Sequence, residues 1–152
     1  MELKLKWHKP KRLTDASKDN GIYGINLGDI PERTGIYIFY REYGAVREAL
    51  YVGKASNLKS RIKQQLNNVK LMKGIENASK GYRRIVYAEF IAKRGQQEDK
   101  CIALIERALI RYYLALEDNI LNKQGTRIRS DIIVSHRSSV KRFIPEKIHH
   151  HK

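Results

Sequence analysis

The order of the predicted elements is two strands, a helix, a third strand and a long helix, which indicates an α/β fold. Helices would pack around a central sheet of three strands that is mainly antiparallel. Two observations carry this prediction. β-Branched and aromatic residues concentrate in three short runs, and apolar residues recur at helical spacing after the second and third runs. A chain of 152 residues can bury one core of this kind.

The first two predicted strands form a β-hairpin over residues 35–53. The run "GIYIFYREYG" is rich in strand-forming residues, and "ALYVG" follows it after a short turn. Within the hairpin, Tyr37 is expected to share a face with Phe39, and Tyr51 with Ala49. Both tyrosine hydroxyls would then leave the same side of the sheet. The third predicted strand is "RRIVYAEFIA".

Two helices are predicted from capping residues and apolar stripes. Ser56 or Asn57 can cap a helix that ends near residue 67. A second helix is predicted over residues 96–116, with an apolar stripe along one side. The polar residues 68–82 predict a loop with at most a short helical turn.

The remainder of the chain is basic and lacks a regular pattern. Residues 1–30 are predicted to form an N-terminal arm with at most one short strand, 31–125 the α/β domain, and 126–152 a basic tail. The arm contains a second copy of the triplet Gly-Ile-Tyr, at residues 21–23. Because the glycines that follow it interrupt a strand, we interpret this copy as a chance repeat.

The charge of the chain indicates a polyanionic partner. There are 31 lysines and arginines against 16 acidic residues, a net charge of +15, which favours nucleic acid over an acidic protein or a lipid surface. No apolar run is long enough for a transmembrane helix, and the N-terminus lacks the apolar segment of a secretory signal. With a single cysteine, Cys101, these features favour a cytoplasmic location and no membrane partner.

Glu106 stands out because it lies on the apolar side of the second predicted helix, between Tyr113 and Ile110 on the helical wheel. An isolated buried carboxylate is costly. It must therefore be paired with a base, bound to a metal or directed into a cleft. Taken alone, a structural ion pair is the simpler explanation.

The segment "LYVGKASNLKSRI" places small and basic residues directly after the second strand. Gly53 permits a close backbone approach, and Lys54 follows it. Arg61 lies beside the buried stripe of the first helix, where its guanidinium can bind a phosphate. With Lys59 and Lys63, these residues are the candidate nucleic-acid contacts. The alternative is an ordinary solvated basic face.

Taken together, these residues resemble the GIY-YIG nuclease family. The matching residues are "GIY" ending at Tyr37, "YVG" beginning at Tyr51, then Arg61, Glu106 in "LIERALI", and Asn122 in "NILNKQG". The stretch around "LYVGKASNLKSRI" is similar to the nuclease domain of the bacterial excision-repair subunit that makes the 3′ incision. The resemblance covers about residues 31–125.

The resemblance implies a metal-dependent DNA endonuclease that leaves 5′-phosphate and 3′-hydroxyl ends. Arg61 would bind the scissile phosphate, and Glu106 would hold one Mg²⁺ or Mn²⁺ per active site. Tyr37, Tyr51 or Lys54 would help to deprotonate the attacking water, with Tyr37 slightly favoured. The implied catalytic residues are thus Tyr37, Tyr51, Lys54, Arg61, Glu106 and Asn122.

The chain departs from the family pattern at two places. Some members carry a histidine one turn after the arginine, where this chain has Gln65. The segment from Glu106 to Asn122 is long, so Asn119 is an alternative to Asn122. The biological process could be restriction, repair or recombination, or the movement of mobile elements. A homodimer would permit double-strand cutting. A non-catalytic nucleic-acid-binding module and an RNA-directed nuclease are the competing interpretations.

Overall fold

The computed structural model describes residues 2–122, 132–136, 143–145 and 147–149. Its elements, in chain order, are β1 (Glu2–Trp7), β2 (Lys11–Arg12), β3 (Thr14–Asp15), the 3₁₀ helix η1 (Ser17–Asp19), β4 (Tyr23–Gly24), β5 (Gly35–Tyr43), β6 (Val46–Ala55), α1 (Leu58–Leu66), α2 (Val69–Glu76), β7 (Tyr82–Ile91), α3 (Glu98–Ala115), β8 (Ile132–His136) and β9 (Lys147–His149). The α/β class is confirmed. The sheet has seven strands where three were expected.

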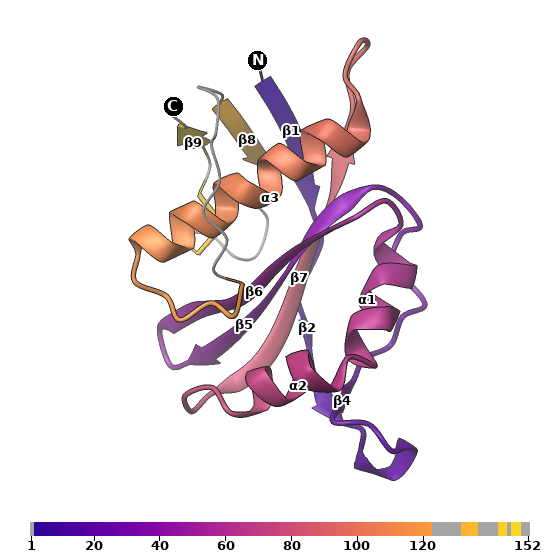
Figure 1. Ribbon diagram of the computed structural model, residues 1–152, viewed down its shortest axis with the longest axis vertical. Coiled ribbons are helices and arrows are strands. Elements are labelled where there is room, and N and C mark those ends of the chain that lie inside the picture. Colours follow the sequence, from indigo (N-terminus) through magenta and orange to yellow (C-terminus); the bar gives the residue numbers. More distant parts are fainter. Residues whose placement is uncertain (1, 123–131, 137–142, 146, 150–152) are drawn as a thin grey trace.

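The β5–β6 hairpin and β7 form an antiparallel part of the sheet, with β6 at the edge (Figure 1). Its register contains one irregularity, because Phe39 pairs with Tyr51 whereas Tyr40 pairs with Ala49. Leu50 therefore forms a bulge. The bulge puts Ala49 on the face that carries α3 and Tyr51 on the face that carries α1. The expectation that these two residues share a face was wrong, because strand alternation alone does not reveal a bulge.

β1 is an inner strand of the sheet and not part of a separate arm. It pairs antiparallel with β7 and parallel with β8, so the strand order is β6-β5-β7-β1-β8-β9, with β2 also paired to β7. Leu3, Leu5 and Trp7 are at most 4% exposed. The structure thus differs from the expected arm over 1–30, and β8 and β9 belong to the sheet although a tail was expected over 126–152.

Two of the three α-helices, α1 and α2, begin at asparagines whose side chains cap them. Asn57 caps α1 by accepting a hydrogen bond from the Ser60 N–H at 3.1 Å, as the sequence predicted. Asn68 caps α2 in the same way through Leu71. α2 occupies part of the segment where a loop was expected, and it buries three apolar side chains. Among the described residues, no helix has both the length and the apolar character needed to cross a membrane.

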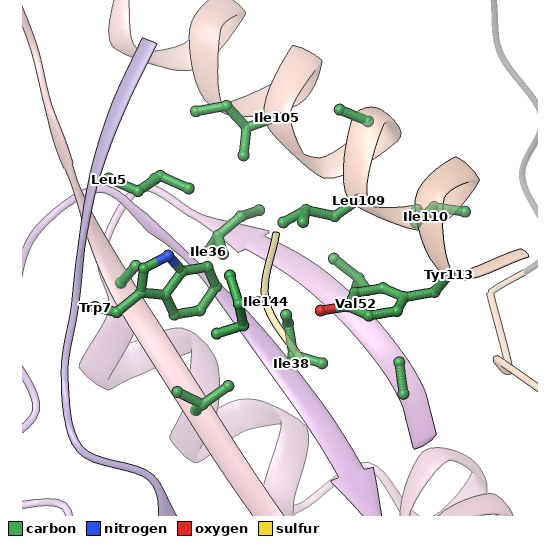
Figure 2. Packing of buried hydrophobic residues seen from close by; sticks show 14 of the residues in the cluster. Leu5, Trp7, Ile36, Ile38, Val52, Ile105, Leu109, Ile110, Tyr113 and Ile144 are labelled. Atoms are coloured by element: carbon green, nitrogen blue, oxygen red, sulfur yellow. The ribbon is translucent and has the colours of Figure 1, made fainter. Parts of the chain in front are cut away.

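Helices cover the sheet from both sides. α3 packs on one face, where Ile105 and Leu109 point towards the strands (Figure 2), while α1 and α2 pack on the other. The first six residues of β5 and the middle of β6 are therefore buried between the two layers, which explains the apolar runs "GIYIFY" and "ALYV". Residues of both α1 and α3 lie near the point where β5 begins and β6 ends.

Gly35 opens β5 and permits a close approach of its neighbours. A Cβ at this position would lie 2.1 Å from the backbone oxygen of Ala88 and 2.6 Å from Leu58 Cδ1. The absence of a side chain lets α1 and β7 approach the first residue of β5. The glycine of the first motif triplet thus has a packing role.

Candidate active site

A cavity of about 900 Å³ lies at the end of the sheet, where β5 begins and β6 ends. The hairpin forms its floor, α1 one wall and α3 the other. Its lining includes five of the six predicted catalytic residues: Tyr37, Tyr51, Lys54, Arg61 and Glu106. The fold therefore gathers side chains from four elements around one space.

Tyr37 and Tyr51 are held together by a buried amide. Their rings stack with centroids 6.2 Å apart. Gln65 of α1 donates from Nε2 to the Tyr37 hydroxyl oxygen at 2.8 Å and, more weakly, to that of Tyr51 at 3.5 Å. Gln65 Oε1 accepts a hydrogen bond from Asn68 at 3.3 Å. Gln65 is only 3% exposed, so the amide is committed to fixing the two hydroxyls.

The pKa of Tyr37 is raised to about 12, chiefly because the ring is buried. The hydrogen bond from Gln65 and the nearby Arg61 act in the opposite direction but do not overcome burial. A general base at neutral pH needs a lower pKa. The Tyr37 hydroxyl therefore keeps its proton near neutral pH while the cavity holds no substrate.

Gly53 is required by the position of the Tyr37 ring. An added Cβ would lie 2.1 Å from Tyr37 Cζ and 2.2 Å from its hydroxyl oxygen. The Tyr37 side chain is fully buried and has little room to move. The glycine of "YVG" thus lets the tyrosine of "GIY" lie flat against the backbone of β6, with which it pairs in the register.

Glu106 projects from α3 into the cavity and is half-buried. Its partner is the backbone N–H of Lys54, which donates to the carboxylate. Desolvation raises the pKa of Glu106, and the positive charges of Lys54, Arg107 and Arg61 only partly offset it. The carboxylate is directed into the cavity and forms no close ion pair among the described residues. Of the three explanations offered for its place on the apolar side of the helix, this arrangement matches a carboxylate directed into a cleft.

Arg61 and Lys54 supply positive charge on either side of this carboxylate. Arg61 Nη1 donates to Gln64 Oε1 at 2.6 Å, which orients the guanidinium from α1. In the described part of the chain, no carboxylate lies within salt-bridge distance of it. Lys54 is exposed at the end of β6. Both cations are available for an anionic ligand.

Asn122 does not line the cavity, but its side chain is hydrogen-bonded to β6, a strand that contributes residues to the cavity lining. Its side chain accepts from the Val52 N–H at 3.3 Å and donates to the Val52 carbonyl. The side-chain amide thus forms the two hydrogen bonds that a neighbouring strand would form at the edge of β6. Val52, its partner, directly precedes Gly53. Asn119 contacts Glu48 instead, at 3.2 Å. Of the two asparagines, Asn122 therefore lies nearer the cavity-lining residues of β6.

Lys59 and Lys63 are not brought to the cavity. They are two positions before and after Arg61, which at 100° per residue puts both on the opposite side of α1. Neither lines the cavity, in contrast to Ser60, Arg61 and Gln64. The second copy of the triplet is also absent from it, because Tyr23–Gly24 forms a separate two-stranded sheet with Thr14–Asp15.

Two more carboxylates lie at the cavity wall. Glu98 and Asp99 begin α3, and Glu98 accepts a hydrogen bond from Thr34 Oγ1 at 2.8 Å. This bond joins α3 to the residue that precedes β5. Among the described residues, no group of three or more histidine, cysteine, aspartate or glutamate side chains could hold a metal ion. Glu106, the predicted metal ligand, lines the same cavity as these two carboxylates.

Gln65 is the site residue that the sequence did not reveal. In the sequence, it is notable only as a departure from the histidine that some GIY-YIG nucleases carry one turn after the arginine. Its position one turn after Arg61 and on the same stripe as Leu58 and Ile62 placed it on the buried side of α1. A polar residue on a buried stripe was the available signal, as it was for Glu106.

The chain has a relative among known proteins. Over 89 residues it is 36% identical to UvrABC system protein C of Methanococcus maripaludis. The matched stretch covers 59% of this chain and 15% of that protein's length. No family model matches, and no solved structure does. The match supports a link to a nuclease family over a short stretch of sequence.

Proposed function

We propose that this protein is a metal-dependent GIY-YIG endonuclease that hydrolyses DNA phosphodiester bonds at the cavity between α1 and α3. The observation that carries the proposal is the convergence of Glu106, Arg61 and the pair Tyr37 and Tyr51 on one space. The cavity holds a half-buried carboxylate, and its cations have no carboxylate within salt-bridge distance among the residues that the structure describes. This combination suits a ligand that brings both phosphate and metal. The partial match to UvrABC system protein C is consistent with a role in DNA repair.

In the proposed reaction, a water oxygen bonds to phosphorus while the bond from phosphorus to the 3′ oxygen breaks. The products are a 5′-phosphate and a 3′-hydroxyl. Arg61 binds the scissile phosphate and stabilises its developing charge. The Tyr37 hydroxyl orients the water by hydrogen bonding, since its pKa of about 12 keeps it protonated. Tyr51 and Lys54 line the same cavity and are the other candidates for the group that takes the proton of the water, which either can do only in its deprotonated form.

Glu106 fits a magnesium or manganese ion by its chemistry. It offers a hard oxygen ligand, and Mg²⁺ commonly binds through one or two carboxylates, with waters and substrate phosphates completing its shell. When bound, such an ion acts as a Lewis acid towards the leaving 3′ oxygen. Lys54 holds the carboxylate in place through its backbone N–H. One ion per cavity is proposed.

The competing function is nucleic-acid binding without cleavage. The net charge of +15 suits both functions equally. A binding surface for phosphates gains nothing from a half-buried carboxylate between two cations, because that charge repels the ligand. Glu106 therefore favours the enzyme. Whether the enzyme cleaves RNA in place of DNA is tested by comparing cleavage of the two substrates.

The test uses purified protein with supercoiled plasmid and with end-labelled oligonucleotides of DNA and RNA. Reactions contain Mg²⁺, Mn²⁺ or a chelator. We expect DNA nicking with metal, none with chelator, and ligatable 5′-phosphate ends. Arg61→Ala should lose at least about a hundredfold in rate. Lys63→Ala, on the other side of α1, serves as the matched control and should stay near the wild-type rate. Undiminished nicking by Arg61→Ala would contradict the proposal.

A further inference from the structure

A second basic surface lies at the other end of the sheet from the cavity. It comprises Arg12, Glu42, Arg47, Tyr82 and Arg84, which we call the hairpin-end face. Directly paired residues in antiparallel strands share a face. Arg12 pairs with Arg84, and Glu42 pairs with both Tyr82 and Arg47. Four neighbouring strands thus present these five side chains on one side.

The hairpin-end face carries surplus positive charge. Glu42 is shared by two arginines, with Arg47 at 2.7 Å and Arg84 at 3.0 Å. Arg12 has no carboxylate within salt-bridge distance among the residues that the structure describes. Three arginines therefore face one glutamate. In a chain of net charge +15, such a surface attracts an anionic polymer and not a basic one.

The same face exposes an aromatic ring beside an arginine. Tyr82 is 54% exposed, and the Arg12 guanidinium lies 4.2 Å from the centroid of its ring. A hollow of about 380 Å³ lies next to them, and its lining also includes Thr14, Asp15, Tyr23 and Arg83. Stacked rings and guanidinium planes bind unpaired bases, so the hollow and the Tyr82 ring together offer a place for a base.

We propose that the hairpin-end face binds a single-stranded nucleic-acid segment, with Tyr82 stacking on a base and Arg12 contacting base and phosphate. A duplex keeps its bases stacked on each other and leaves the ring of Tyr82 unused, which is why the single strand is favoured. This inference goes beyond the proposed cleavage and does not depend on it. Along β5, the face is five residues from Tyr37, about 17 Å at 3.4 Å per residue.

The test is fluorescence anisotropy with a labelled single-stranded oligonucleotide and its duplex, using the full chain in chelator so that metal-dependent cleavage does not interfere. We expect the single strand to bind more tightly than the duplex. Tyr82→Ala should raise the Kd for the single strand about tenfold or more, whereas Tyr82→Phe should stay near wild type. Arg12→Ala should also weaken binding and lower the slope of log Kd against log salt by about one.

Tyr43→Ala is the matched control. Tyr43 is 52% exposed and has Lys80 5.6 Å from its ring centroid, but strand alternation puts it on the opposite face of β5 from Glu42. Wild-type binding by Tyr82→Ala, equal losses in Tyr43→Ala and Tyr82→Ala, or tighter binding of the duplex would each overturn the inference. Because no cleavage is measured, these outcomes leave the proposed nuclease activity unaffected.

Discussion

At the scale of single residues, the close contact between Gly53 and the Tyr37 ring determines where that ring lies in the cavity. Gly53→Ala brings a methyl group to within 2.2 Å of the Tyr37 hydroxyl oxygen, so the ring must shift. We expect a loss of stability of about 1–3 kcal/mol and a large loss of nicking activity. Urea unfolding and plasmid nicking measure the two effects.

Gly24→Ala is the control for this substitution. A Cβ at Gly24 meets only Ala16 Cβ, at an ordinary 3.6 Å. Stability and activity of that variant should both remain close to wild type. If Gly53→Ala also behaved like wild type, the tight contact between β6 and Tyr37 would have no functional role.

Gln65 gives the second residue-scale prediction. Gln65→Leu keeps the approximate volume but removes the donor to Tyr37 and Tyr51. The two hydroxyls then lose their common anchor. Since that hydrogen bond lowers the pKa of Tyr37, the ultraviolet titration of the tyrosines should move to higher pH. We also expect kcat to fall more than KM changes. An unchanged titration would show that the amide does not control Tyr37.

Residue chemistry explains which site residues could be predicted. Glu106 was predictable as a cavity residue because it lies on the apolar side of its helix, where only a cleft or a partner resolves the conflict. Arg61, which lies beside the buried stripe of α1, was predicted from the sequence resemblance. Tyr37 was predictable as a member of the site, but the rise of its pKa to about 12 was not. That rise depends on how completely α1 covers the ring, which is a tertiary property.

At the scale of elements, the edge of β6 sets the position of the cavity floor. The segment 118–122 runs beside this edge, and Leu121 N–H donates to the Leu50 carbonyl at 2.7 Å. Asn122→Ala removes both side-chain bonds to Val52. We expect a loss of about 1–2 kcal/mol in urea unfolding and a measurable loss of nicking rate.

Asn119→Ala is the comparison for the edge. Asn119 contacts Glu48 through its side chain at 3.4 Å, on an exposed part of the chain. We expect a smaller effect on both stability and nicking. A greater loss of activity in Asn119→Ala than in Asn122→Ala would assign the motif asparagine to residue 119.

The elements differ in how well the sequence predicted them. The hairpin, α1, β7 and α3 have strong periodicity or caps and were predicted near their observed bounds. α2 was not, because only Leu71, Met72 and Ile75 are apolar and buried in its eight residues. β1 was seen only as a short strand, since nothing local indicates that its partners are β7 and β8.

At the scale of the whole molecule, Glu106 links stability to pH. Its pKa is raised in the folded protein by desolvation, so the folded state binds this proton more tightly than the unfolded state. As pH rises from the ordinary value of 4.5 through the raised one, the wild type loses stability. Glu106→Gln lacks this loss. In chelator, we expect the variant to be more stable than wild type at pH 7 and to lose that advantage near pH 4.

Thermal unfolding of both proteins across this pH range measures the difference. Two results would contradict a raised pKa for Glu106: a Glu106→Gln variant that is less stable than wild type at pH 7, or a stability difference between the two proteins that does not change with pH. Other titrating carboxyl groups, such as Asp118 with its raised pKa, contribute equally to both proteins. The comparison therefore isolates Glu106.

The central claim is that the cavity hydrolyses DNA and does not merely bind it, and one paired measurement tests it. Plasmid cleavage is measured at saturating Mg²⁺, and oligonucleotide binding is measured in chelator, for wild type and Glu106→Gln. We predict that the variant binds DNA at least as tightly, because a repelling charge is gone, while its cleavage rate falls by at least about a hundredfold. Cleavage by the variant at the wild-type rate, or binding by wild type without any cleavage, would contradict the claim.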